Sequence, residues 1–393
     1  MAKRLRVALF VESSSAYGRG VLRGIRRYVA DHQSWSILWK QLDIITPLPR
    51  DLANWEIDGL ISRSTDPEMA EQLQSARFPV VDLTDRHKDF GLNHIWTDNQ
   101  AVGQIAAEHL IERRFRHFAF VGYEKERWCI DRCNSFQEEL AQHGFTCHTY
   151  LKGDLNLSHE PLPDQRDHLA EWLKSLPQPV GIMACHDVRG HQILDVLSEL
   201  EISVPENAAV IGCDDDELRC QFTSPPMSSV RPNSDLIGYR SAFLLDELMA
   251  KRQQSPLPTE YIAPLGITIR HSSDILAIED QDIAMAVKLI REHALEGITV
   301  KDILTQVPVS RSYLERGMRR FLKRSPQAEI RNIQLKRVRQ LLSETEFPLS
   351  EIAHQCGFQH PEYMSVVFKR ELGETPGQYR KRTRMGSAAP AIR

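Results

Sequence analysis

The feature that most constrains the fold of this chain is a change of hydrophobic period near residue 280. Before it, short apolar runs rich in β-branched residues alternate with segments of helical period, and after it the period is helical throughout. Strand-helix alternation predicts parallel sheets, because a helix must carry the chain back before the next parallel strand begins. The 393 residues are therefore predicted to form an α/β part followed by an all-α part.

The α/β part contains too many strand-like runs for one sheet. The predicted strands lie at residues 5–11, 35–39, 57–61, 79–83, 117–122, 179–185 and 208–213. Helical stretches such as 23–30, 101–113 and 192–200 lie between them. We predict two doubly wound sheets, and hence two lobes. In such sheets ligands bind beyond the carboxyl ends of the strands.

Polar and aromatic side chains follow several of these predicted strands. The candidate ligand-binding residues are Ser13, Tyr17, Arg19, Trp128, Arg132, Asp187, Arg189 and Asp214. Carboxylates and guanidinium groups can bind neighbouring hydroxyls in pairs, and an aromatic ring can cover the apolar face of a sugar. The simpler alternative is that each aspartate after a strand only caps the next helix.

An enzyme interpretation is possible at the first loop, where Gly18-x-Gly20 opens a helix after a strand. The third glycine of a dinucleotide-binding loop should fall at residue 23, which is Arg23, and Gly24 is one place late. The chain also has neither a phosphate-binding GxxxxGK loop nor a GxSxG nucleophile motif. The sequence therefore favours neither catalysis nor a cofactor.

Metal binding and membrane insertion are not predicted either. The seven cysteines lack CxxC spacing and should be free thiols, and the 15 histidines show no HExxH pattern. No apolar run approaches the roughly 20 residues that a membrane span needs. The amino terminus has no long apolar stretch typical of a secretory signal, so we expect a cytoplasmic protein.

Charge is distributed unequally between the two parts. From residue 276 onward there are 20 basic and 14 acidic residues, a balance of +6, whereas residues 1–275 carry 29 basic and 39 acidic residues, a balance of −10. Only the carboxy-terminal part suits a polyanion such as nucleic acid.

The all-α part shows one pattern twice. Thr299, with Asp302 three places on, is a predicted helix cap, a turn follows at 308–309, and a basic helix covers 310–322. After a connecting helix at 326–342, Ser350 is predicted to cap a second short helix at 351–356. A turn at Gly357 and a helix at 361–372 complete the repeat. This is a pair of helix-turn-helix units.

A connecting helix of about 17 residues spans roughly 26 Å. Two recognition helices at its ends could therefore reach successive major grooves of DNA, which repeat about every 34 Å. The predicted DNA contacts are Arg311, Ser312, Glu315, Arg316, Arg319, Gln359, His360, Glu362, Tyr363 and Lys369. A helical packing module with basic solvated faces is the alternative.

The α/β part resembles the sensor domains of LacI/GalR-type regulators. The resemblance lies in the segments VIGCDDDE at 210–217, SSVRP at 228–232 and LGITIRHSS at 265–273, and it covers residues 1–275. It implies a two-lobed fold like that of periplasmic sugar-binding proteins, with Arg132, Asp187 and Asp214 holding the sugar. His186 stands where the family usually has asparagine.

The all-α part resembles the DNA-binding domains of AraC/XylS-type regulators. The matching residues include Ile352, Ala353, Gly357 and Phe358, then Phe368-Lys369, Gly373-x-Thr375-Pro376 and Tyr379-Arg380. The predicted domain covers residues 283–384. We predict a linker at 276–282 and a disordered tail at 385–393.

The order of the two parts is similar to that of the xylose operon regulatory proteins of bacteria. This resemblance implies a cytoplasmic transcription activator induced by D-xylose. It also implies a homodimer that binds tandem operator half-sites in double-stranded DNA and contacts RNA polymerase. The alternatives are a regulator that responds to another pentose or hexose, a repressor, a constitutive DNA-binding protein, and an α/β enzyme fused to a DNA anchor.

Overall fold

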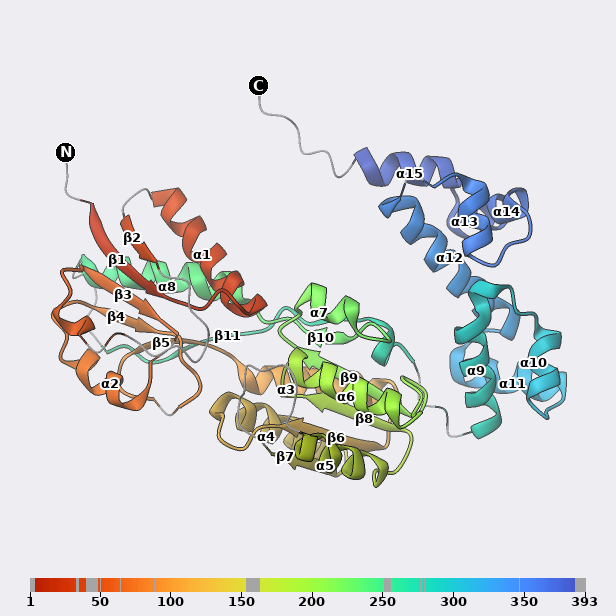
Figure 1. The fold of residues 1–393 in the computed structure, drawn as a ribbon, viewed down its shortest axis with the longest axis horizontal. Coiled ribbons are helices and arrows are strands. Elements are labelled where there is room, and N and C mark those ends of the chain that lie inside the picture. The colour runs from red at the N-terminus through yellow and green to blue at the C-terminus, as the bar shows by residue number, and fades with distance from the viewer. Residues whose placement is uncertain are drawn as a thin grey trace. The chain divides into compact units, whose positions relative to one another are not determined.

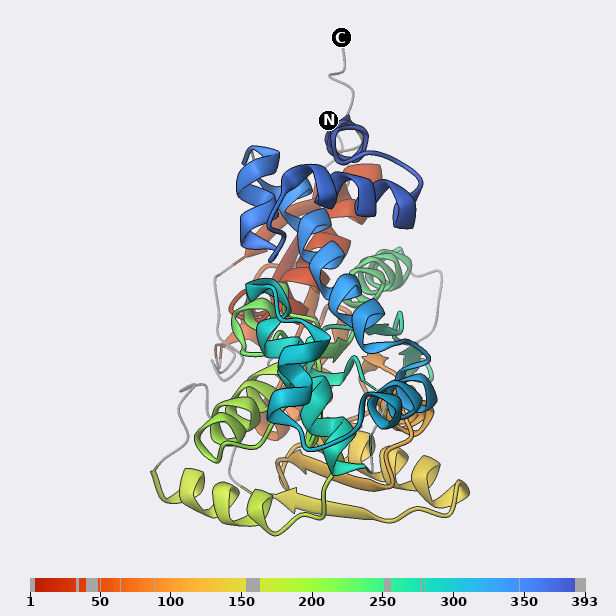
Figure 2. The same cartoon turned by 90° about the vertical axis from the view of Figure 1, so that its right-hand side faces the viewer.

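The computed structural model describes residues 4–32, 35–39, 49, 51–63, 65–87, 89–152, 163–250, 256–275, 278, 280–345 and 347–385. The chain forms two compact units, Met1–Ile275 and Leu276–Arg393 (Figures 1 and 2). Residues 276, 277 and 279 of the predicted linker, and the predicted tail beyond Met385, lie outside the described residues.

The first unit has two six-stranded sheets, one in each lobe. The first sheet has the order β11-β5-β4-β3-β1-β2 and the second β12-β10-β9-β8-β6-β7. Neighbouring strands are parallel except β10 and β12, so the prediction of two parallel sheets is confirmed. The first-lobe strands are β1 (Leu5–Phe10), β2 (Trp35–Trp39), β3 (Gly59–Ser62), β4 (Val80–Asp82), β5 (Asn93–Thr97) and β11 (Glu260–Ile262). The second-lobe strands are β6 (His117–Gly122), β7 (Cys147–Leu151), β8 (Val180–Ala184), β9 (Ala208–Cys213), β10 (Ser228–Val230) and β12 (Ile267–Thr268).

Helices cover both faces of each sheet (Figure 1). The first lobe contains α1 (Ala16–His32), α2 (Pro67–Gln74), α8 (Ser234–Met249) and the 3-10 turn η1 (Leu52–Asn54). The second lobe contains α3 (Asn99–Glu112), α4 (Arg127–Gln142), α5 (Pro163–Lys174), α6 (Asp187–Glu199), α7 (Glu217–Phe222) and the 3-10 turn η2 (His271–Ser273).

Alternation along β1 shows why this sheet is covered on both sides. Val7 and Leu9 pack with residues of α1 and α8, whereas Ala8 and Phe10 pack with residues of α2. Successive side chains of a strand point to opposite faces, so a strand that is apolar at every position needs a partner layer on each side. The continuous apolar run in the sequence reflects this double burial.

The chain crosses between the lobes three times, after β5, after β10 and after β11. The strands that precede these crossings end between the lobes.

The second unit contains helices and their connections, with no strand among its described residues. Its helices are α9 (Gln281–His293), η3 (Ala294–Glu296), α10 (Val300–Gln306), α11 (Arg311–Leu322), α12 (Pro326–Glu344), α13 (Leu349–Gln355), α14 (Pro361–Leu372) and α15 (Pro376–Met385). Thr299 and Asp302 form the predicted capping box of α10, and Thr375 caps α15 through the backbone N–H of Gln378.

The predicted cap at Ser350 is wrong. Helix α13 begins at Leu349, and Pro348 occupies the capping position without a side-chain hydrogen bond. The Pro348 carbonyl accepts the first helical hydrogen bond, from the Ile352 N–H. Proline suits a helix start because its fixed φ is compatible and its missing N–H is not needed there.

Candidate functional site

A buried ion pair lies where the first and third strands end. Glu12 follows β1 and Arg63 follows β3, and their side chains pair directly. Ser15 Oγ donates to Glu12 Oε1 at 2.7 Å, while the Glu12 side chain is fully buried. Glu12 Oε2 and Arg63 Nε are buried and have no hydrogen-bond partner among the described residues. Such unsatisfied atoms are rare in native structures and indicate where a polar ligand can bind.

Tyr17 on α1 completes this side of the cluster. The Arg63 guanidinium lies 4.3 Å from the centre of the Tyr17 ring, and the Tyr17 hydroxyl is 2.9 Å from Thr97 Oγ1. Burial raises the pKa of Tyr17, so the phenol stays neutral and can donate or accept a hydrogen bond.

Arg132 lies at the centre of the second-lobe side. Its Nε donates to Asn99 Oδ1 at 2.8 Å, and its Nη1 donates to the Cys185 carbonyl at 2.6 Å. The guanidinium also lies 4.9 Å from the Trp128 ring centre, and Trp128 Nε1 donates to Glu126 at 3.1 Å. Arg132 and Trp128 are therefore buried in fixed orientations.

Asp214 occupies a strained turn directly after β9. Its φ is +114° and that of Asp215 is +49°, both unusual for residues other than glycine. Burial raises the pKa of Asp214 to about 6, with Arg132 and Arg63 opposing the rise and Asp85 and Glu12 adding to it. Strain of this kind is characteristic of binding sites, where the surrounding fold holds a residue in place.

Asp187 has both carboxylate oxygens engaged within the protein. Oδ1 accepts from Ser229 Oγ at 2.6 Å and Oδ2 from the Asp216 N–H at 2.7 Å. Burial and the neighbouring Asp214 raise the pKa of Asp187. These contacts orient the loop that carries Asp214.

His186 stands at the start of α6. It is the N-cap of α6, where its Nδ1 accepts from the Arg189 N–H at 3.2 Å. Burial and Arg132 lower the pKa of His186 to about 3, so the ring is neutral and keeps this acceptor. The ring also packs against Trp128.

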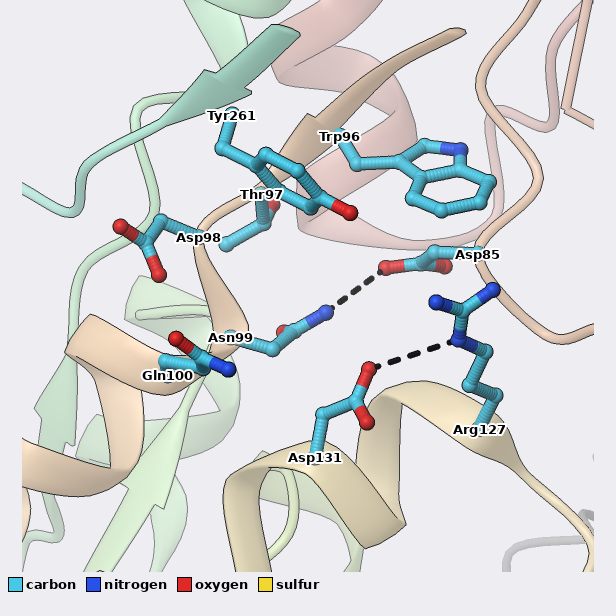
Figure 3. A pocket seen from close by; sticks show the side chains of 9 residues that line it. All are labelled: Asp85, Trp96, Thr97, Asp98, Asn99, Gln100, Arg127, Asp131 and Tyr261. Carbon is cyan, nitrogen blue, oxygen red and sulfur yellow. Dashed lines mark hydrogen bonds and ion pairs between the residues drawn. The ribbon is translucent and has the colours of Figure 1, made fainter. Parts of the chain in front are cut away.

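A pocket of about 260 Å³ lies beside this cluster, between the two lobes of the first unit. Figure 3 shows its lining: Asp85, Trp96, Thr97, Asp98, Asn99, Gln100, Arg127, Asp131 and Tyr261. Asn99 donates to Asp85 at 3.3 Å, and Arg127 pairs with Asp131. Carboxylates, amides and aromatic rings suit a small polyhydroxylated ligand.

None of the eight predicted ligand-binding residues lines this pocket. Two of them instead contact lining residues: the Tyr17 hydroxyl contacts Thr97, and Arg132 donates to Asn99. Arg189 donates to Gln192 and to the Lys152 carbonyl. Arg132 forms its hydrogen bonds with other residues, Asn99 and Cys185.

Ser13 lies in the loop between β1 and α1, and Arg19 lies in the first turn of α1. The Ser13 carbonyl accepts from Arg19, which is exposed and also lies 3.6 Å from Asp216 of the second lobe. This ion pair bridges the lobes at the surface.

The sequence prediction missed four residues that the structure places in or beside this site: Glu12, Arg63, Asp85 and Asn99. Glu12 and Arg63 are charged residues directly after apolar strands, and that position was the available signal. The described part of the chain has no cluster of three or more histidine, cysteine, aspartate or glutamate residues placed to hold a metal. All seven cysteines are free.

The second unit carries the predicted DNA-contacting residues on its surface. Nine of the ten are exposed, and Glu315 is half-buried beside Arg311, which donates to it at 3.1 Å. They lie along α11 and at the start and outer face of α14.

The two helix-turn-helix units are tied together through α12. Gln334 is buried, and its Nε2 donates to the Ala294 carbonyl at 3.0 Å and the Gly357 carbonyl at 3.2 Å. One side chain of α12 thus connects η3, which precedes the first helix-turn-helix, with the turn of the second.

Comparison with known proteins identifies the family. An XylR N-terminal domain matches residues 6–100, a periplasmic binding protein-like domain matches 107–273, and a helix-turn-helix domain matches 303–382. The xylose operon regulatory protein of Escherichia coli K12 is 31% identical over 388 residues, covering 96% of this chain and 97% of that protein. The chain belongs to the family of the xylose operon regulatory proteins.

Further relatives agree with this assignment. The xylose operon regulatory protein of Haemophilus influenzae is 30% identical over 95% of this chain and 98% of its own length. A solved structure of the xylose-binding transcription activator XylR has a TM-score of 0.79 at 30% identity, covering 97% of this chain and 98% of that one. A LacI-family regulator from Enterococcus faecium with bound ribose shares the fold at 19% identity, covering 68% of this chain and 97% of its own, with a TM-score of 0.56.

Membership makes this chain a regulator of transcription and not an enzyme, and the predicted two-part fold is confirmed. No helix in the described ranges is long and apolar enough to cross a membrane.

Proposed function

We propose that this regulator is a cytoplasmic activator that binds D-xylose or a related monosaccharide between its two α/β lobes and operator DNA through its helical unit. The observation that carries the sugar assignment is the buried set of paired charges at the strand ends. Glu12, Asp85 and Asp214 face Arg63 and Arg132, so positive and negative groups nearly balance. A balanced site favours a neutral ligand with many hydroxyls over an anion or a cation.

The size of the pocket supports a single sugar ring. At about 260 Å³ it is smaller than the 300–1,000 Å³ typical of sites for drug-sized ligands. Trp96 and Tyr261 supply aromatic faces, and Asp85, Asn99 and Gln100 supply hydrogen-bonding groups. The similar XylR protein is a xylose-binding transcription activator, which supports D-xylose as the first candidate.

Ligand binding would act through the angle between the lobes. Two ion pairs bridge them, Arg19 with Asp216 and Arg86 with Glu126. A sugar held by both lobes selects one arrangement of the three crossing segments, and that arrangement determines how the helical units of a homodimer meet tandem half-sites. An activator of this kind then acts on RNA polymerase.

Calorimetry on the full chain tests the sugar assignment. D-Xylose, L-arabinose, D-ribose and D-glucose are titrated into wild type, into Arg132→Gln and into the control Arg240→Gln, whose pair with Glu260 lies elsewhere on the first lobe. Saturable binding of one pentose, lost in Arg132→Gln and kept in the control, supports the proposal. Tighter binding of a hexose would assign a different inducer, and no binding of any sugar would refute a sugar sensor.

A further inference from the structure

The two recognition helices bury side chains at the same positions but differ at several outward positions, one of which changes from a cation to an apolar side chain. Both contain 12 residues, and counting from their N-caps, Ser310 and His360, positions 4 and 8 are fully buried in each. Those positions hold Leu314 and Met318 in α11 and Met364 and Phe368 in α14. The helices can therefore be compared residue by residue.

Position 6 is exposed in both helices, and it is Arg316 in α11 and Val366 in α14. The exposed fraction of Val366 is 64%, so it takes no part in the core that Met364, Val367 and Phe368 build. Position 9 is a basic residue in both helices, Arg319 and Lys369. The helices thus share buried side chains at positions 4 and 8 and a basic residue at position 9, whereas position 6 is cationic in α11 and apolar in α14.

Tyr363, at position 3 of α14, adds to the apolar character of this face. It is 52% exposed, and its hydroxyl accepts from Arg331 Nη2 at 3.0 Å. The Arg331 guanidinium lies 5.1 Å from the Tyr363 ring centre and holds the ring from the side of α12. Tyr363 and Val366 are three residues apart and so share one face of the helix.

The bases that suit these side chains differ. Arginine donates two hydrogen bonds to guanine O6 and N7 in the major groove, whereas an apolar side chain there contacts the C5 methyl group of thymine. We propose that the two half-sites of the operator are chemically unequal: Arg316 of α11 reads a guanine, and Val366 of α14, beside Tyr363, reads a thymine methyl group. The inference rests on the proposed DNA-binding function and specifies the base at each half-site.

An unequal pair of half-sites also fixes the orientation in which the helical unit binds its operator. A chain turned end for end on its operator would place Val366 against guanine and Arg316 against thymine, and both contacts would be lost. The orientation of the helical unit on DNA then follows from these two side chains.

The test begins with the operator. The full chain, saturated with D-xylose and separately without sugar, selects duplexes from a random library, and the selection is repeated with Arg316→Ala and Val366→Ala. We expect Arg316→Ala to weaken the preference for a guanine in one half-site. Val366→Ala should weaken the preference for a thymine in the other. Val366 is mostly exposed, so its replacement leaves the fold intact.

Replacing that thymine by deoxyuridine removes the methyl group and nothing else. Binding by wild type should weaken about fourfold, the effect of removing one buried methyl group, while binding by Val366→Ala should not change. Lys369→Ala is the matched control: it weakens binding to every duplex and keeps the sensitivity to deoxyuridine. Val366→Arg should replace the thymine preference by guanine.

Two results would overturn the inference, and they differ. Sequence-selective binding in which deoxyuridine weakens wild type and Val366→Ala equally, or not at all, removes the thymine contact but leaves the regulator intact. Absence of any selected sequence with or without sugar would refute the proposed DNA-binding function together with this inference.

Discussion

Asp214 combines backbone strain with a carboxyl group that resists ionisation. Its pKa is about 6 in the folded chain, against an ordinary value of 3.8, mainly because it is buried. The folded state therefore binds a proton more readily than the unfolded state between these two values, and stability contributed by this group falls as pH rises through that window. At neutral pH the Asp214 carboxyl is therefore ionised, although its burial in the folded chain favours the neutral form.

Asp214→Asn should make the protein more stable and less able to bind sugar. We expect the free energy of unfolding at pH 7.5 to rise by about 1–3 kcal/mol, with little gain at pH 4, because the amide needs no proton. Thermal unfolding at both pH values and sugar calorimetry measure this. A variant that is less stable than wild type at pH 7.5 would contradict the assignment.

We expect Glu12 and Arg63, which are 51 residues apart in sequence, to be strongly coupled in their contributions to the free energy of unfolding. Glu12→Gln or Arg63→Met alone should each cost about 3–5 kcal/mol, because the remaining charge stays buried without its partner. The double variant should cost clearly less than the sum. A double-mutant cycle by urea unfolding measures the coupling, and strict additivity would show that the pair is not a unit.

Elements determine how the two reading helices are spaced. Gly357 has φ +70°, and a Cβ there would lie 2.7 Å from the Gly297 nitrogen. The turn of the second helix-turn-helix unit thus approaches the glycine backbone between η3 and α10, beside the hydrogen bonds of Gln334. This contact allows two short helical units to behave as one body.

Gly357→Ala should therefore destabilise the helical unit by more than its backbone strain alone, about 1–3 kcal/mol plus the cost of the collision. Gly373→Ala is the matched control, because Gly373 has φ +77° and no atom near its hypothetical Cβ. Circular dichroism at 222 nm and calorimetric unfolding compare the two. Equal losses would show that the close approach to Gly297 is unimportant.

Lys369 and Arg316 should differ in how their removal affects DNA binding. Lys369→Ala should weaken binding to all duplexes and reduce the slope of log affinity against log salt by about 0.9, because one phosphate contact is lost. Arg316→Ala should instead relax base preference. Filter binding from 50 to 200 mM salt measures both, and an unchanged slope for Lys369→Ala would remove its phosphate role.

The whole molecule couples two ligands if the proposed function is correct. Sugar and operator must then change each other's affinity by the same factor, because the coupling free energy belongs to the complex of all three. We expect a five- to hundredfold effect in the same direction from both titrations. Calorimetry of D-xylose with and without operator, and of operator with and without D-xylose, measures it; unequal factors at equilibrium would exclude a simple linked scheme.

The two-part organisation, the parallel sheets and the helix-turn-helix pair could all be predicted from the amino-acid sequence. These features follow from local period, caps and turn residues, which is why the strands at 117–122 and 208–213 and the helix at 361–372 fall where they were predicted. The prediction that Ser350 caps a helix was wrong because α13 already begins at Leu349, with Pro348 in the capping position.

Which polar residues come into contact could not be predicted from the sequence, because it depends on how the elements pack. Glu12 and Arg63 pair because β1 and β3 are adjacent in the sheet, and Asn99 meets Arg132 because α3 packs on α4. Arg189 follows a strand just as Asp214 does, yet its side chain turns to Gln192 and Lys152. Sequence position places a residue at the end of a strand, but the direction of its side chain depends on neighbours that are distant along the chain.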